Sequence, residues 1–537
     1  MAISKNVLYR NPIVPGFAPD PSVVLVDGVY YLVTSSFHVF PGLPIYASRD
    51  LKEWKHIGNA LNRLDQMSLR RASTNHAPLD TGHSMVASGG LFAATIRYNK
   101  GRFYIICTNA AVNVADIKSS ALDNFIISTT DIYASAWSDP VYIPFFGIDP
   151  NLFFDDDGKV YVQGCYMLGH GKQPTCTIKQ FEVDIETGDA LSETREIWEG
   201  FAKYDTEGPH IYKVGGYYYL MAAEGGTFEH HLLSISRSKN IWGPYETAES
   251  NPILTADGTD EYIQNTGHGE LFQDDNGRWW AVALAVRNEP TCQPLGRESF
   301  LAAVEWPEGG WPRVLQPKLE FHAPSPVKDQ AALSSWNPVV PPRVEDLYIA
   351  DPDFTKYKLP ETAQGSFKLT PSLEAFSEPY GTSTFIGRRQ RGINAVATTE
   401  IDLAVSKTTL KGGTVKAGLA MYKDYMRHAS LGYDFAARKV TFRTVNISTK
   451  LDRVSETELA VEEGETLLSL KIVASSAQYQ FLAKAGGGDW VEVGTCSTKE
   501  LAAREMTGPI LGAFANTTSP QGERAEVAFT DLVVEAQ

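Results

Sequence analysis

The fold is predicted by a pattern that first occurs in residues 20–33, DPSVVLVDGVYYLV. A β-branched run leads into the pair Asp27-Gly28, and an aromatic-rich run follows. Because Asp-Gly and Asn-Gly pairs tolerate the positive φ angles of a tight turn, this stretch predicts a β-hairpin. The pattern recurs around five glycines, each followed within three residues by aromatic side chains: Gly28, Gly101, Gly158, Gly216 and Gly277.

The distance between these glycines indicates how the hairpins are organised. Successive glycines are 57 to 73 residues apart, which suits a unit of about four strands repeated as the blades of a propeller. Solenoid repeats are usually shorter. Residues 1–321 are therefore predicted to form a five-bladed β-propeller.

The character of the chain changes after the fifth repeat. Residues 322–349 are rich in proline and predict an extended linker. Beyond it, alternating apolar and polar runs at 414–421, 439–445, 467–473 and 525–534 predict strands. The predicted fold class is all-β: the propeller, then an antiparallel β-sandwich of the concanavalin-like jelly-roll type over residues 350–537.

The composition of the chain disfavours some classes of binding partner. The formal net charge of −16 disfavours nucleic acid and anionic membrane surfaces, which both require a basic footprint. No run of eighteen apolar residues is present, so no transmembrane helix is expected. The first residues lack the apolar stretch of a secretory signal, which favours a cytoplasmic location and leaves open a secreted protein with a trimmed signal. The oligomeric state is not predicted.

The five cysteines give no framework for disulfides. Their number is odd and their spacing matches no metal-ligand motif, so we expect no disulfide scaffold.

One register of the repeats carries unusual chemistry. Counting back eight residues from the first turn glycine and nine from the others reaches Asp20, Phe92, Asp149, Glu207 and His268. If the five units surround an axis, these side chains meet. Three carboxyl groups in a small buried space acquire separated pKa values, as a glycosidase needs for one proton donor and one base. A single acid here could equally cap a turn, but three at one buried register favour catalysis.

These residues lie in stretches that strongly resemble glycoside hydrolase family 43, in particular its β-xylosidase branch with a C-terminal sandwich domain. The matching stretches are NPIVPGFAPDPS (11–22), SFHVFPGLPIY (36–46), SRDL (48–51), GIDPN (147–151), TEGPH (206–210) and GHG (267–269). The resemblance implies an inverting, metal-independent hydrolysis with Asp20 as general base and Glu207 as general acid. Asp149 would tune the pKa of the acid and orient it. Inversion implies that the base and acid carboxyls stand about 6.5–9.5 Å apart.

The resemblance also implies a small pocket for one terminal pentose. Phe37 would form an aromatic wall and Arg297 would hydrogen-bond sugar hydroxyls. His268 would contact a structural calcium ion or a water on the axis, although no cofactor is required; its alternative is an inner-strand histidine satisfied by a carboxylate. At Phe92 the chain departs from the Trp-Ala-Pro segment common in the family. Phenylalanine offers a smaller stacking surface than tryptophan, which leaves xylose selectivity open.

We therefore expect an exo-acting hydrolase that removes terminal β-D-xylosyl or α-L-arabinofuranosyl groups from xylo-oligosaccharides or arabinoxylan fragments. The alternatives are an endo-acting arabinan hydrolase and a non-catalytic carbohydrate-binding protein, which would have no use for the three acids. Residues 61–85 make the first repeat long and are expected to shape the pocket mouth, reach the sandwich or lie on the surface. Phe514 is a candidate contribution of the sandwich to the pocket, although an aromatic on a strand is more often core.

Overall fold

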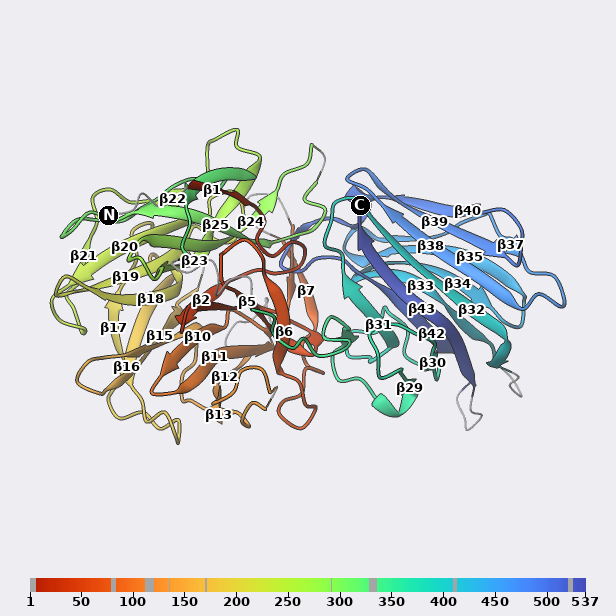
Figure 1. Cartoon of the computed structure of the whole chain (residues 1–537), viewed down its shortest axis with the longest axis horizontal. Helices are drawn as coiled ribbons and strands as arrows, with labels where there is room; N and C mark the ends of the chain where they lie inside the picture. Colours follow the sequence, from red (N-terminus) through yellow and green to blue (C-terminus); the bar gives the residue numbers. More distant parts are fainter. Residues whose placement is uncertain are drawn as a thin grey trace.

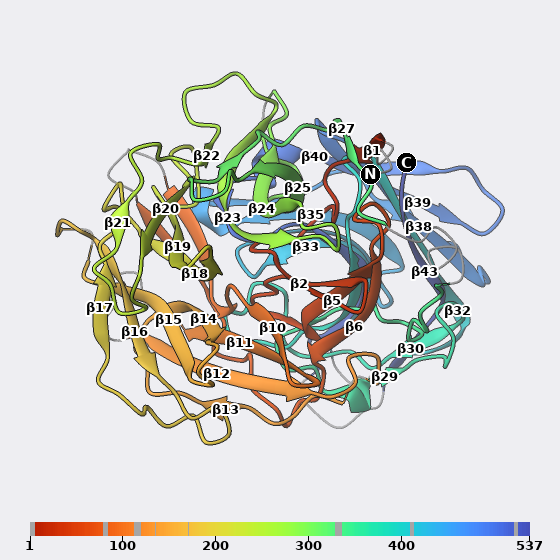
Figure 2. The ribbon, with the colours of Figure 1, turned by 60° about the vertical axis from the view of Figure 1, so that its left-hand side comes forward.

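The computed structural model describes residues 6–78, 84–111, 120–134, 136–169, 171–290, 292–327, 336–408, 413–519 and 525–537. It confirms the predicted fold class. Five antiparallel sheets form a propeller and two larger sheets form a sandwich beside it (Figure 1). Figure 2 shows the five sheets around a common centre, with the first main strand of each sheet innermost.

Each blade is a meander of four main strands. Blade 1 contains β2 (Ser22–Val26), β3 (Val29–Val33), β5 (Gly42–Ser48) and β6 (Lys55–Leu61). Blade 2 contains β10 (Thr95–Asn99), β11 (Arg102–Ala111), β12 (Ala121–Thr129) and β13 (Val141–Tyr142), with β9 (Gly90–Leu91) also paired to β11. Blade 3 contains β14 (Ile148–Phe154), β15 (Val160–Met167), β16 (Cys176–Glu182) and β17 (Arg195–Trp198).

The last two blades follow the same order. Blade 4 contains β18 (Glu207–Val214), β19 (Tyr217–Glu224), β20 (Leu232–Ser238) and β21 (Glu246–Thr247), with β22 (Leu254–Thr255) also paired to β20. Blade 5 contains β23 (Ile263–Gln273), β24 (Trp279–Arg287), β25 (Glu298–Glu305) and β26 (Arg313–Val314).

The hairpin turn that opened the sequence analysis forms as predicted. Val26 pairs with Val29, which leaves Asp27 and Gly28 as a two-residue turn. Their φ angles of 49° and 73° are those of a type I′ turn, which suits the twist of the two strands.

The ends of the propeller are tied together by strand pairing. β1 (Asn6–Arg10) runs antiparallel to β27 (Glu320–Pro324). The predicted linker therefore begins inside a strand, with His322 paired to Leu8. It ends at β28 (Tyr348–Ile349), which pairs with β4 (Val39–Phe40) of the propeller.

The sandwich consists of two antiparallel sheets. The first contains β29 (Tyr357–Lys358), β30 (Phe367–Leu369), β43 (Glu526–Ala536), β32 (Ala395–Lys407), β38 (Leu467–Ala474), β39 (Gln478–Ala485) and β40 (Val491–Ser497). The second contains β31 (Thr384–Arg389), β42 (Ile510–Thr517), β33 (Val415–Asp424), β34 (Arg427–Asp434), β35 (Lys439–Asn446), β36 (Leu451–Val454) and β37 (Leu459–Ala460). All four runs predicted as strands lie in these sheets.

The long first repeat reaches the sandwich. It forms the hairpin β7 (Thr74–Pro78) and β8 (Ser84–Ser88). β41 (Arg504–Glu505), which follows the short helix α2 (Thr498–Leu501), pairs in parallel with β8. A backbone ladder thus joins the two halves of the molecule. Among the described residues, no helix is long and apolar enough to cross a membrane.

Candidate active site

The inner ends of the blades have unusual backbone conformations. Asp20 and Asp149 both have a φ of 55°, and His268 has a φ of 29°. Register shifts interrupt β14 between Ile148 and Asn151 and β18 between Glu207 and His210. A bulge of this kind re-aims a side chain out of the regular alternation, and left-handed non-glycine residues cluster at functional sites.

Asp20 is buried and held by two partners. Ser35 donates from Oγ to Asp20 Oδ2 over 2.5 Å, and Arg297 donates from Nη1 to Asp20 Oδ1 over 3.3 Å. Burial alone would raise the pKa of Asp20, but the charge of Arg297, with His268 and the Ser35 hydrogen bond, brings that pKa below its ordinary value. Asp20 is therefore an ionised carboxylate at neutral pH.

Asp149 lies beside His268. His268 Nδ1 is 3.8 Å from Asp149 Oδ2 and 3.9 Å from Asp20 Oδ1, and the Gly208 amide donates to Asp149 Oδ2 over 3.2 Å. Burial raises the pKa of Asp149 to about 6, opposed by His268. The imidazole of His268 therefore connects two of the predicted acids.

The surroundings of Glu207 shift its pKa in the opposite direction to that of Asp20. Burial raises its pKa well above the ordinary value, and the neighbouring carboxylates Asp149 and Asp205 raise it further. It stays partly accessible. One carboxyl that holds its proton and one that loses it are the two groups that acid–base hydrolysis of a glycosidic bond requires.

The predicted binding residues come together around Arg297. Its guanidinium carbon lies 5.5 Å from the centre of the Phe37 ring, and Phe37 lies 5.3 Å from Phe92. Thr227 accepts from Arg297 Nη1 over 3.0 Å. The structure thus links Asp20, Asp149, Glu207, His268, Phe37, Phe92 and Arg297 through direct contacts or electrostatic interactions.

The sandwich contacts the candidate active site through Met506 and not through the candidate residue Phe514. Phe514 packs in the interior of the sandwich, 5.2 Å from Phe376, as its core alternative describes. The contact comes from Met506 instead: its carbonyl oxygen accepts from Arg297 Nε over 3.3 Å and from Nη2 over 3.2 Å. Every residue has a carbonyl, so no sequence signal marks this one.

The calcium ion implied by the resemblance lacks an oxygen cage among these contacts. Calcium takes six to eight oxygen ligands, whereas His268 has two acidic oxygens near its Nδ1. One of these belongs to Asp20, which Arg297 already neutralises. The side chains described here do not fit a calcium site by themselves.

Three side chains that could bind a metal ion other than calcium do lie close together. The spacing of the cysteines in the sequence did not predict this group. Within the described ranges, Cys165, Cys176 and Glu207 place their sulfur atoms and a carboxylate oxygen within 4.8 Å of one another. No disulfide joins any of the five cysteines, all of which lie in the described part of the chain. The register of strands β15 and β16 brings the two cysteines together, and their spacing along the chain does not reveal this register.

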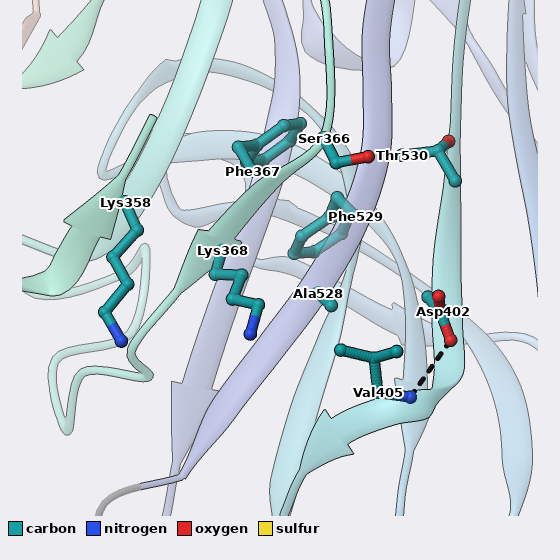
Figure 3. Close-up of a pocket in the computed structure, with 9 residues that line it drawn as sticks. All are labelled: Lys358, Ser366, Phe367, Lys368, Asp402, Val405, Ala528, Phe529 and Thr530. Atoms are coloured by element: carbon teal, nitrogen blue, oxygen red, sulfur yellow. Dashed lines mark hydrogen bonds between the residues drawn. The ribbon is translucent and has the colours of Figure 1, made fainter. Parts of the chain in front are cut away.

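The sandwich carries a separate cavity of about 490 Å³ (Figure 3). Lys358 and Lys368 line it, and both pair with Glu526. Its aromatic members, Phe367 and Phe529, are stacked on each other in the core, with ring centres 5.0 Å apart. None of the predicted site residues lines this cavity.

The chain matches two known families. Residues 9–312 match Glycosyl hydrolases family 43, and residues 348–533 match the Beta xylosidase C-terminal Concanavalin A-like domain. The chain therefore belongs to glycosyl hydrolase family 43 and is a glycoside hydrolase.

Relatives of similar length share both halves. The chain is 34% identical to a non-reducing end alpha-L-arabinofuranosidase of Bacteroides ovatus, over 94% of this chain and 90% of the relative. It is 29% identical to a xylan 1,3-beta-xylosidase of a Vibrio species, over 90% of each chain. The crystal structure of a xylan beta-1,4-xylosidase from Bacillus halodurans superposes with a TM-score of 0.85 at 26% identity, covering 98% of this chain and 100% of that one.

Proposed function

We propose that this protein is an inverting exo-glycosidase that removes terminal β-D-xylosyl or α-L-arabinofuranosyl groups from xylan-derived oligosaccharides. The observation that carries the proposal is the contrast between two neighbouring carboxyls: Arg297 and Ser35 hold Asp20, whereas burial and nearby carboxylates raise the pKa of Glu207. The relative from Bacteroides ovatus is named for action at the non-reducing end, which supports the exo mode. Relatives named for arabinofuranose and for xylose support one pocket for either pentose.

In the proposed reaction Glu207 donates its proton to the glycosidic oxygen as the bond to the anomeric carbon breaks. A water attacks that carbon from the opposite face, and Asp20 takes the proton that this water releases. Arg297 and Ser35 keep Asp20 ionised before the step. Arg297 also presents its guanidinium beside the Phe37 ring, in a position to bind sugar hydroxyls.

The test compares Asp20→Asn and Glu207→Gln with wild type on xylobiose and on the nitrophenyl xyloside and arabinofuranoside. We expect Asp20→Asn to lose activity on all three. Glu207→Gln should lose more activity on xylobiose than on the nitrophenyl substrates, because nitrophenolate leaves with little help from an acid. Asp155→Asn, whose carboxylate pairs with Lys213 at a turn, is the matched control and should keep wild-type activity.

Proton NMR of the first sugar released should show the inverted anomer. Retention would contradict the assigned roles, as would full activity of Asp20→Asn. A wild type that binds xylo-oligosaccharide and hydrolyses none of the substrates would establish the carbohydrate-binding alternative instead.

A further inference from the structure

We propose that Cys165, Cys176 and Glu207 form a binding site for a thiophilic metal ion such as Zn²⁺ or Cd²⁺, and that occupation of this site blocks hydrolysis. The metal-binding part follows from the three side chains alone. The inhibitory part rests on the proposed role of Glu207 as proton donor.

The strand register brings the two thiols to one face of blade 3. Met167 lies opposite Cys176, and Cys165 lies opposite Ile178, in the antiparallel pair β15–β16. Because side chains alternate along a strand, Cys165 and Met167 point to the same side. Cys165 and Cys176 are therefore diagonal cross-strand neighbours.

Glu207 completes the group from the neighbouring blade. It is the first residue of β18, directly before the bulge that interrupts this strand. Its carboxylate and the two sulfur atoms lie within 4.8 Å of one another. In a tetrahedral zinc site with Zn–S bonds of about 2.3 Å and Zn–O bonds of about 2.0–2.2 Å, neighbouring ligand atoms are about 3.5–3.8 Å apart. The ligand atoms thus need to move by about 1 Å at most.

The ligand set selects a class of ion. Metal binding releases the two thiol protons to solvent, and the resulting thiolates favour Zn²⁺, Cd²⁺ and other thiophilic metals over Mg²⁺ or Ca²⁺, which prefer oxygen. Three protein ligands leave a fourth position for water. Both cysteines are almost fully buried, against Ile148 and the partly buried Phe92, whereas Glu207 is partly accessible. The ion therefore approaches past Glu207 and leaves its open position on that side.

Metal binding removes the acid from catalysis. A carboxylate that coordinates a cation has given up its proton and cannot protonate the leaving oxygen. Inhibition by the metal would therefore appear as loss of turnover without loss of fold.

The experiment titrates the reduced full-length protein with Cd²⁺ and follows the ultraviolet absorption of thiolate–cadmium bonds. We expect one Cd²⁺ per chain in wild type, and no such absorption in the double variant Cys165→Ala/Cys176→Ala. The single variant Cys176→Ser serves as the second measurement should the double variant not fold, and should also lose the band. Cys496→Ala, which changes a buried free cysteine of the sandwich, is the matched control and should keep it.

Hydrolysis is measured in parallel with added Zn²⁺, each variant relative to its own activity without metal. Zn²⁺ should inhibit wild type and Cys496→Ala, and should leave the double variant at its metal-free rate. No cadmium–thiolate band in wild type, or a band of full intensity in Cys176→Ser, would overturn the proposal. A wild type that binds one Cd²⁺ at the two thiols yet hydrolyses no glycoside would refute the proposed function and leave the metal site standing.

Discussion

Asp149 interacts with both carboxyls whose pKa values move in opposite directions. Its charge is the largest influence on the pKa of Glu207 after burial, and its own pKa is raised by burial and by Asp20. Since these groups titrate together, the pH profile reports macroscopic values of the cluster. At this scale the residue types at the repeat register were predictable, because hairpin turns mark the register in the sequence.

Asp149→Asn should lower the pKa of the alkaline limb of kcat/KM. Removing a nearby negative charge makes the anionic form of Glu207 less unfavourable, so Glu207 loses its proton at a lower pH. Activity at pH 8 should fall more than activity at pH 5. The measurement is the pH profile on xylobiose, whose leaving group needs the acid, with Asp155→Asn as the control that leaves the limb in place. An alkaline limb that stays or rises would contradict this interpretation.

The partners of these residues were less predictable. Ser35 and Thr227 act through hydroxyl groups on other loops, and the sequence contains many equivalent hydroxyls. The proximity of Cys165 and Cys176 was not predictable from the cysteine spacing, because metal-ligand motifs are recognised along the chain, whereas these two residues meet through cross-strand register.

The bulged inner strands are the elements that orient the side chains of the candidate active site. Gly208, next to Glu207, has a φ of 51°, and a Cβ built on it would lie 2.9–3.1 Å from the ring atoms of His268. Strand periodicity predicted that these strands exist. It could not predict the bulges, since an extra residue leaves the apolar pattern on either side intact.

Gly208→Ala should therefore cost both stability and activity. The positive φ is unfavourable for alanine by about 1 kcal/mol, and the new methyl group displaces His268. Gly215→Ala is the matched control: it lies in the turn that follows the same strand, with a φ of 56° and nothing within 4 Å of its Cβ position. Both variants should lower Tm, and only Gly208→Ala should also lower kcat/KM. Equal losses of activity would show that the contact with His268 is unimportant.

At the scale of the whole molecule, a buried charge cluster lies in the sandwich where it meets the propeller. Lys423 pairs with Glu505 over 2.6 Å, and Arg427 pairs with both Asp424 and Glu505. All four side chains are at most 2% exposed. Glu505 lies in β41, which pairs with β8, and precedes Met506, whose carbonyl holds Arg297. The cluster is thus connected to Arg297 of the candidate active site through one short segment.

Glu505→Gln should weaken both the fold and substrate binding. Breaking a buried ion pair from one side costs about 3–5 kcal/mol, and a displaced Met506 carbonyl releases Arg297. We expect a lower Tm and a raised KM. Asp452→Asn removes an exposed pair with Arg443 and should change stability by less than about 1 kcal/mol. An unchanged KM in Glu505→Gln would show that the charge cluster does not influence substrate binding.

Five buried histidines with lowered pKa values predict acid sensitivity of the fold; one of them is His210, whose pKa burial lowers well below its ordinary value. Burial lowers the pKa of His38 to about 4 and those of His56, His231 and His428 to about 3. The unfolded chain binds these protons near the ordinary pKa, so stability is fully present above pH about 6.5 and is lost as the pH falls towards the folded values. Each histidine contributes about 2 kcal/mol to the loss between pH 7 and 5.

Scanning calorimetry should therefore show a Tm that falls between pH 7 and pH 5, and His56→Gln should lose less than wild type over this range. The raised pKa values of Asp149 and Glu207 act in the opposite sense, since these groups bind protons more readily in the folded state. A Tm that rises on acidification would show that the carboxyl groups dominate.

The order of the two folds could be predicted from the sequence, but their contact could not. The change from hairpin repeats to a proline-rich stretch separates them clearly. Part of the contact is made by β41, a two-residue strand, and no periodicity can be recognised in two residues. The insertion of residues 61–85 was recognised by its length alone, and reaching the sandwich was one of three expectations for it.

The carbonyl that holds Arg297 belongs to a residue 209 positions later in the chain. At a synthesis rate of roughly 5–20 residues per second, a ribosome needs about 10–40 s to travel from one to the other. During that interval the blades can already assemble as the chain emerges, while Arg297 still lacks its carbonyl partner. Sugar-cleaving activity on the ribosome should therefore begin only after Met506 has left the exit tunnel, long after the ring of blades is complete.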